Sequence, residues 1–126
     1  MNLGNVIIVE DESLVALDLE GRINEMGYHV TSVHDNGEDA LRAIGAEKPD
    51  LVVMDVQIFG DLDGIEVGRR ARDEHGTRIL FLTSQLDPIA AGAAGFSLNH
   101  PRVSKPFSGS DLERAMQILT HPAVSA

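Results

Sequence analysis

The sequence predicts an α/β protein, a three-layer α/β/α sandwich in which helices cover both faces of a parallel sheet. Three short apolar runs, at residues 6–9, 51–54 and 79–82, are rich in strand-forming residues and lack polar alternation, which is typical of strands buried on both faces. Helical patterns lie between these runs. Strands that alternate with such helices are joined by right-handed crossovers, and these connections build a parallel sheet.

Two weaker candidates complete a predicted sheet of five strands. Residues 30–33 (VTSV) are more polar than the three apolar runs, so we expect them to form an edge strand. Residues 102–104 (RVS) are the candidate for the fifth strand. The ligands of such a sheet gather at the carboxyl ends of its strands, where backbone groups are free.

The first two helices are predicted from apolar stripes and from the residues that end them. A stripe from Val15 to Met26 is stopped by Gly27, a residue typical of helix C-termini. The second helix is predicted to start at Asp35, which lies three residues before Glu38 in a spacing similar to a capping box. It ends near a proline and carries a stripe of Ala40, Leu41 and Ile44.

Two later helices are also clear, and one is not. Residues 65–75 form a helical pattern closed by Gly76, and the last helix follows Ser108. Residues 86–95 could open a helix, but Gly92 and Gly95 weaken it, so we expect this helix to be short or mobile. The last helix carries a stripe of Leu112, Ala115, Met116 and Leu119.

The composition is that of one globular domain. The chain has 126 residues, of which 43% are hydrophobic and 24% charged, so it can bury a normal core. The absence of cysteine excludes disulfides, thiolate zinc sites and a cysteine nucleophile.

A formal net charge of -10 repels a phosphate backbone, so no direct nucleic-acid partner is expected. No apolar run approaches membrane-spanning length, and we expect a soluble, cytoplasmic protein with no membrane partner.

Polar side chains follow four of the predicted strands. Glu10 and Asp11 come after the first strand, Asp55 after the third, Thr83 after the fourth and Lys105 after the fifth. The carboxyl ends of parallel strands share one edge of the sheet, so these side chains should meet there. Crowded carboxylates repel one another unless a cation intervenes, and oxygen ligands suit magnesium. A magnesium site is therefore predicted at this edge.

Each of these residues also has a structural interpretation. An acidic residue after a strand often caps the next helix, which Glu12 or Ser13 could do. Thr83 could be an ordinary strand residue and Lys105 a solvated charge. Asp55 is the strongest signal, because it ends a β-branched run without a hydrophobic reason. Taken together, a metal, a carboxylate nucleophile, a hydroxyl and an ammonium are what phosphoryl transfer to a carboxylate needs.

The sequence resembles the receiver domain of two-component response regulators over essentially its whole length. The resemblance implies a flavodoxin-like strand order of 2-1-3-4-5. It also implies a single receiver domain over residues 1–126, with a core of about 5–120 and no output domain. The matching segments, in order, are 6–12 (VIIVEDE), 51–55 (LVVMD), 79–84 (ILFLTS) and 104–107 (SKPF).

By this resemblance, Asp55 is the phosphoacceptor, and Thr83 and Lys105 bind the phosphoryl oxygens. The peptide bond between Lys105 and Pro106 is commonly cis in the family, and proline is the residue for which that isomer costs little. The domain is expected to catalyse only its own magnesium-dependent phosphorylation and dephosphorylation, so it is not an enzyme with a separate substrate.

The resemblance also implies a ligand set for Mg²⁺, in whose place Mn²⁺ can serve. Asp11, Asp55 and the backbone carbonyl of Gln57 hold the ion, and Glu10 acts through water. Gln57 also separates this chain from haloacid-dehalogenase-like phosphatases, which need a second acid at that position as a proton donor.

The chain departs from the family at the fifth strand. Family members switch when the threonine hydroxyl moves and an aromatic side chain on this strand turns inward, but the corresponding residue here is Arg102. We interpret Arg102 first as a partner contact, with pairing to a carboxylate or a silent role as alternatives. Pro106 and Phe107 are assigned to the same switch or partner region. Ordering of the glycine-rich segment 90–95 is a further hypothesis for switching.

The implied function is phosphoryl transfer between proteins. A sensor histidine kinase or a histidine phosphotransfer protein is the expected donor, and a downstream target protein is the expected reader. The five histidines of this chain are scattered and expected on the surface, so none is assigned as the donor. The alternative is a receiver-like binding module that signals without phosphorylation. Messenger, relay and phosphate-sink roles all stay open.

Overall fold

The structure is a computed structural model that describes residues 2–58, 60–83, 95–96 and 100–120. Within these residues, five parallel strands form one sheet in the order β2-β1-β3-β4-β5, which confirms the predicted order. The strands are β1 Asn5–Val9, β2 His29–His34, β3 Leu51–Asp55, β4 Arg78–Thr83 and β5 Arg102–Ser104.

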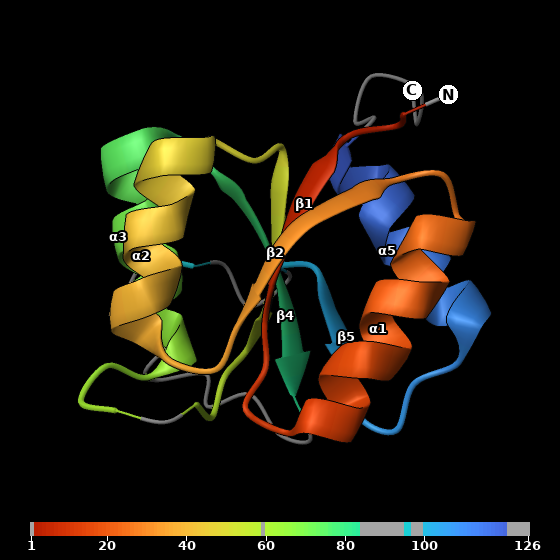
Figure 1. Ribbon diagram of the computed structural model, residues 1–126, viewed down its shortest axis with the longest axis horizontal. Helices are drawn as coiled ribbons and strands as arrows, with labels where there is room; N and C mark the ends of the chain where they lie inside the picture. The colour runs from red at the N-terminus through yellow and green to blue at the C-terminus, as the bar shows by residue number, and fades with distance from the viewer. Residues whose placement is uncertain (1, 59, 84–94, 97–99, 121–126) are drawn as a thin grey trace.

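Helices cover both faces of the sheet, which confirms the three-layer sandwich. Figure 1 shows α2 and α3 on one side of the strands and α1 and α5 on the other. The helix predicted at 86–95 falls outside the described residues except at Gly95. The described helices are α1 Ser13–Glu25, α2 Gly37–Glu47, α3 Gly64–His75 and α5 Gly109–Thr120.

The core is divided in two by the sheet. Successive side chains of a strand point to opposite faces, so in β3 Val52 and Met54 join the cluster beneath α2 and α3, whereas Leu51 and Val53 join the cluster beneath α1 and α5. All four side chains are fully buried, and each contributes about 1.5–3 kcal/mol to folding. Burial on both faces explains why this strand carries an unbroken apolar run.

Capping residues begin and end the helices largely where the sequence predicts. Asp63 and Ser108 accept hydrogen bonds from backbone N–H groups in the first turns of α3 and α5, at 2.8 and 3.1 Å. Gly76 ends α3 with a left-handed φ of 66°, and Gly27, with a φ of 103°, follows the end of α1. In both places glycine adopts a backbone conformation that other residues avoid.

The start of α2 corrects one prediction. The N-cap is Asn36 rather than Asp35, and its side-chain oxygen accepts the backbone N–H of Asp39 at 2.9 Å. Asp35 instead accepts a hydrogen bond from the side-chain amide of Asn36, at 2.8 Å. Both residue types cap helices well, so spacing alone did not distinguish two adjacent candidates.

The lead-in to β5 corrects a second prediction, that each histidine lies on the surface. His100 is half-buried, and its Nε2–H donates to the carbonyl oxygen of Ile79 at 2.8 Å. Because Pro101 has no N–H group to extend the β4–β5 ladder, the imidazole supplies a donor to β4. His100 also packs against Phe81 and Phe96, with ring centroids 5.4 and 4.8 Å away. This burial, together with the nearby Arg72 charge, lowers the pKa of His100.

Candidate functional site

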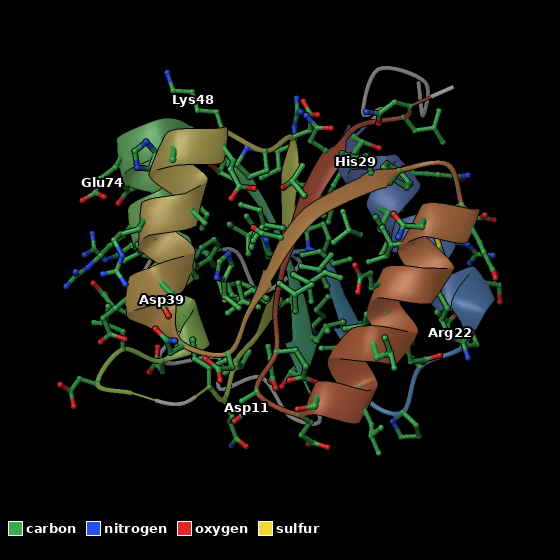
Figure 2. All side chains as sticks on the ribbon, in the orientation of Figure 1. Asp11, Arg22, His29, Asp39, Lys48 and Glu74 are labelled. Atoms are coloured by element: carbon green, nitrogen blue, oxygen red, sulfur yellow. The ribbon has the colours of Figure 1, made fainter. Side chains whose placement is uncertain are left out.

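The candidate site lies at the carboxyl edge of the sheet, where β1, β3, β4 and β5 end. Figure 2 shows Asp11 at this edge, at the foot of the sheet. A cavity of about 350 Å³ opens there. The residues that line it are Asp11, Glu12, Asp55, Val56, Gln57, Thr83 and Lys105. The topology therefore brings residues from four strand ends, distant in sequence, into one cavity.

Lys105 joins the first and third strands through ion pairs. Its Nζ donates to Glu10 Oε1 at 2.6 Å and to Asp55 Oδ2 at 3.1 Å. The side chains of Glu10 and Asp55 are 0% and 8% exposed, whereas that of Lys105 is 21% exposed. Burial alone lowers the pKa of Lys105, but the hydrogen bonds to Glu10 and Asp55 outweigh it and leave the pKa raised. The ammonium therefore stays charged beside the two carboxylates.

Three carboxylates crowd together at the same place. One oxygen from each of Glu10, Asp11 and Asp55 lies within 4.8 Å of the others. Burial, followed by contact with Asp55, raises the pKa of Glu10 to about 7. Burial and the charge of Asp55 also raise the pKa of Asp11. Both shifts express the cost of like charges that are partly removed from water.

The donor set fits a hard divalent cation. Its three carboxylates supply only oxygen ligands, which is the chemistry that Mg²⁺ and Mn²⁺ favour. Lys105 compensates Glu10 and Asp55, whereas Asp11 has no ion pair with a described residue. The excess negative charge faces an open cavity, and a cation is the group that relieves it.

The backbone around Asp55 is held in place from two directions. The N–H of Gln57 donates to Asp55 Oδ1 at 3.1 Å, and the N–H of Gly64 donates to the Val56 carbonyl at 2.8 Å. A Cβ atom added to Gly64 would lie 2.0 Å from the backbone oxygen of Asp55. The first turn of α3 thus approaches the end of β3 more closely than any side chain allows. No pattern in the sequence assigns this role to Gly64.

The helix-capping interpretation of the acidic run is wrong for Glu12. Glu12 does occupy the N-cap position of α1, but its side chain makes no capping hydrogen bond. Glu10 instead pairs with Lys105, and the carboxylate of Asp11 lies beside those of Glu10 and Asp55. The acidic run is therefore not explained by the start of the helix.

The residues predicted for switching or partner contact do not line the cavity, although their neighbour Lys105 does. Arg102 is exposed on β5, opposite Phe81 in the strand register. Pro106 is exposed and Phe107 is half-buried against the core cluster beneath α1 and α5. The bond between Lys105 and Pro106 is cis, as predicted. The contact partners of these residues stay predictions.

The chain is similar to known signalling proteins. A family model described as the response regulator receiver domain matches residues 6–117. A probable transcriptional regulator, ycf27 of Cyanophora paradoxa, is 36% identical over 120 residues, which cover 94% of this chain and 49% of that protein. The transcriptional regulatory protein PdtaR of Mycobacterium tuberculosis is 34% identical over 119 residues, which cover 90% and 55%.

A solved structure supports the same comparison. The signal receiver domain of a modulated diguanylate cyclase from Desulfovibrio desulfuricans G20 superposes with a TM-score of 0.86 at 30% identity, and the match covers 99% of this chain and 100% of that one. The chain spans about half the length of the curated relatives it matches. Among the described residues, no helix has both the length and the apolarity that a membrane crossing requires.

Proposed function

The chain belongs to the response regulator receiver domain family of two-component systems, and from that membership we propose that it accepts a phosphoryl group on Asp55. The observation that carries the proposal is the position of Lys105, which bridges Asp55 and Glu10 beside Asp11. An ammonium held against a carboxylate at the edge of an open cavity suits a reaction in which negative charge gathers on phosphoryl oxygens.

Asp55 is the nucleophile in the proposed reaction. One carboxylate oxygen attacks phosphorus, a P–O bond forms, and the P–N bond to the imidazole of a phosphohistidine donor breaks with its electron pair leaving on the nitrogen. The backbone N–H of Gln57 donates to Oδ1 and the Lys105 ammonium to Oδ2, and these two hydrogen bonds orient the carboxylate. Thr83 lines the same cavity, so its hydroxyl is available to the incoming phosphoryl oxygens. The domain promotes only its own phosphorylation and dephosphorylation.

A divalent cation belongs to the proposal as a cofactor. Asp11, Asp55 and the backbone carbonyl of Gln57 would hold Mg²⁺ or Mn²⁺, with Glu10 as an indirect ligand. When bound, such a cation neutralises charge on the carboxylates and on the phosphoryl oxygens. The chain's own part is to keep three carboxylates within reach of one another and to hold Lys105 against Glu10 and Asp55.

We place the donor protein on a groove beside the cavity. This groove, of about 500 Å³, shares Lys105 with the site and continues along Leu14, Val15 and Phe107. Leu14 is 82% exposed, and with Val15 and Phe107 it gives this groove a contiguous apolar lining that another protein can cover. A histidine kinase or phosphotransfer protein seated there would bring its phosphohistidine to Asp55.

The test is intact-protein mass after incubation with acetyl phosphate, with and without Mg²⁺, on the wild type and on Asp55→Asn. One added phosphoryl group that requires both Mg²⁺ and Asp55 is the expected result. If no group is added, even with candidate kinases supplied, the proposal fails and a binding module that signals without phosphorylation takes its place. Leu14→Ser should slow transfer from a protein donor while leaving acetyl phosphate labelling unchanged.

A further inference from the structure

A second groove lies on the other side of α1, between this helix and the β2–α2 turn. It has a volume of about 420 Å³. The large apolar side chains of its lining are Leu17 on α1 and Val33 on β2, which are 65% and 38% exposed. Large apolar side chains that face solvent in one groove are less stable there than when another surface covers them. No step of the proposed phosphoryl transfer uses either residue.

Carboxylates surround this apolar pair. Five carboxylates line the groove together with the imidazole of His34, and no lysine or arginine belongs to its described lining; the five are those of Glu10, Asp11, Glu20, Asp35 and Asp39. Figure 2 labels Asp11 at the foot of the sheet and Asp39 on α2. Asp39 is paired with Arg42 and Glu10 with Lys105, but no ion pair within the described residues reaches the other three carboxylates. The groove therefore joins an apolar floor to a rim on which Glu20 and Asp35 carry negative charge that no described ion pair compensates.

The negative charge of the groove indicates which kind of molecule can bind there. A second copy of the chain carries a formal net charge of -10 and would be repelled, as would nucleic acid or an anionic membrane. Cationic side chains at the rim would gain from Glu20 and Asp35, and an apolar side chain between them would cover Leu17 and Val33. We propose that this groove binds a basic, amphipathic segment of a partner protein, at a surface distinct from the donor groove at Leu14.

The experiment uses a defined probe on the full chain. The probe is an amidated peptide of lysine and leucine whose leucines fall on one face of a helix, and binding is followed by ¹⁵N chemical shifts and by fluorescence anisotropy. Shifts confined to residues 10–20 and 33–39, which contain the groove lining, are expected. A scrambled peptide of the same composition should bind at least about tenfold more weakly, because it cannot place its leucines together.

Two pairs of variants separate the groove from general charge attraction. Leu17→Ser should weaken peptide binding about tenfold. Leu14 is an exposed leucine on the same helix but outside this groove, so Leu14→Ser should change peptide binding by less than about twofold. Glu20→Lys should weaken binding more than Glu25→Lys, which adds the same charge elsewhere on α1. Acetyl phosphate labelling of Leu17→Ser should match the wild type.

Three results would overturn the inference. The first is equal loss of binding in Leu17→Ser and Leu14→Ser, and the second is equal binding of the scrambled peptide. The third is a set of chemical shifts spread over the acidic surface rather than confined to the groove. Because Leu17 is mostly exposed, its serine variant should retain the wild-type melting temperature, which guards against a loss caused by unfolding.

Discussion

At the scale of single residues, the candidate site holds charges that oppose folding. One oxygen from each of Glu10, Asp11 and Asp55 lies within 4.8 Å of the others, and burial, together with the neighbouring Asp55, raises the pKa values of Glu10 and Asp11. Sites that bind charged ligands commonly store such repulsion, because the ligand then relieves it. The acidic cluster is therefore better explained by what binds there than by what it contributes to the fold.

Asp11→Asn should make the metal-free protein more stable. The raised pKa of Asp11 means that its charged form is disfavoured in the fold, so a neutral amide should gain up to about 1 kcal/mol. Melting temperature in the presence of a chelator measures this gain. Added Mg²⁺ should raise the melting temperature of the wild type but not that of the variant, because a ligand is lost.

Asp61→Asn is the matched control for this prediction, since Asp61 is an exposed aspartate outside the cluster. It should leave both the chelated stability and the response to Mg²⁺ unchanged. Destabilisation of Asp11→Asn in chelator, or an intact response to Mg²⁺, would show that repulsion and metal binding are not centred on Asp11.

At the scale of elements, helix starts show what local pattern can and cannot resolve. The pattern placed α2 within one residue, yet Asn36 and not Asp35 caps it. For α3, the predicted closure at Gly76 is confirmed. The close approach of Gly64 to the end of β3 was missed, because a glycine that begins a helix looks the same in sequence whether or not backbone lies against it.

Asn36→Ala should destabilise the protein by about 1 kcal/mol, the usual cost of a lost N-cap. The side-chain oxygen of Asn36 accepts the Asp39 N–H, and alanine leaves that donor without its partner. Asp35→Ala is the neighbouring control and should cost less than about 0.5 kcal/mol, because Asp35 is exposed and caps nothing. Urea unfolding measures both, and a larger loss in Asp35→Ala would contradict the assigned cap.

At the scale of the whole molecule, one side chain connects the beginning of the chain to its end. Lys105 follows β5, and Glu10, its nearest partner, follows β1, 95 residues earlier. The pair forms only when β3 and β4 are in place between these two strands. The site is therefore complete only in the fully assembled sheet.

Lys105→Met should destabilise the metal-free protein by about 1.5–3 kcal/mol, because two charge-assisted hydrogen bonds are lost and Glu10 stays buried without a cation. The partial exposure of Lys105 favours the lower half of that range. In a Glu10→Gln background the same substitution should cost less, since fewer buried charges remain. Urea unfolding of the wild type, the two single variants and the double variant in chelator gives the coupling free energy between Lys105 and Glu10. Equal costs of Lys105→Met in both backgrounds would exclude this pair as a stabilising contact.

The amino-acid sequence was enough to predict the strands, most of the helices and the kinds of side chain that follow the strands. Unbroken apolar runs specified strands buried on both faces, and the residues that follow them specified carboxylates, a hydroxyl and an ammonium at one edge. These properties are readable because they depend on neighbours along the chain. Three contacts follow only from the three-dimensional arrangement: Lys105 lies closer to Glu10 than to Asp55, Gly64 lies against the backbone of Asp55, and the His100 side chain bonds to Ile79. Those contacts are set by distances between strands and helices, which no local pattern contains.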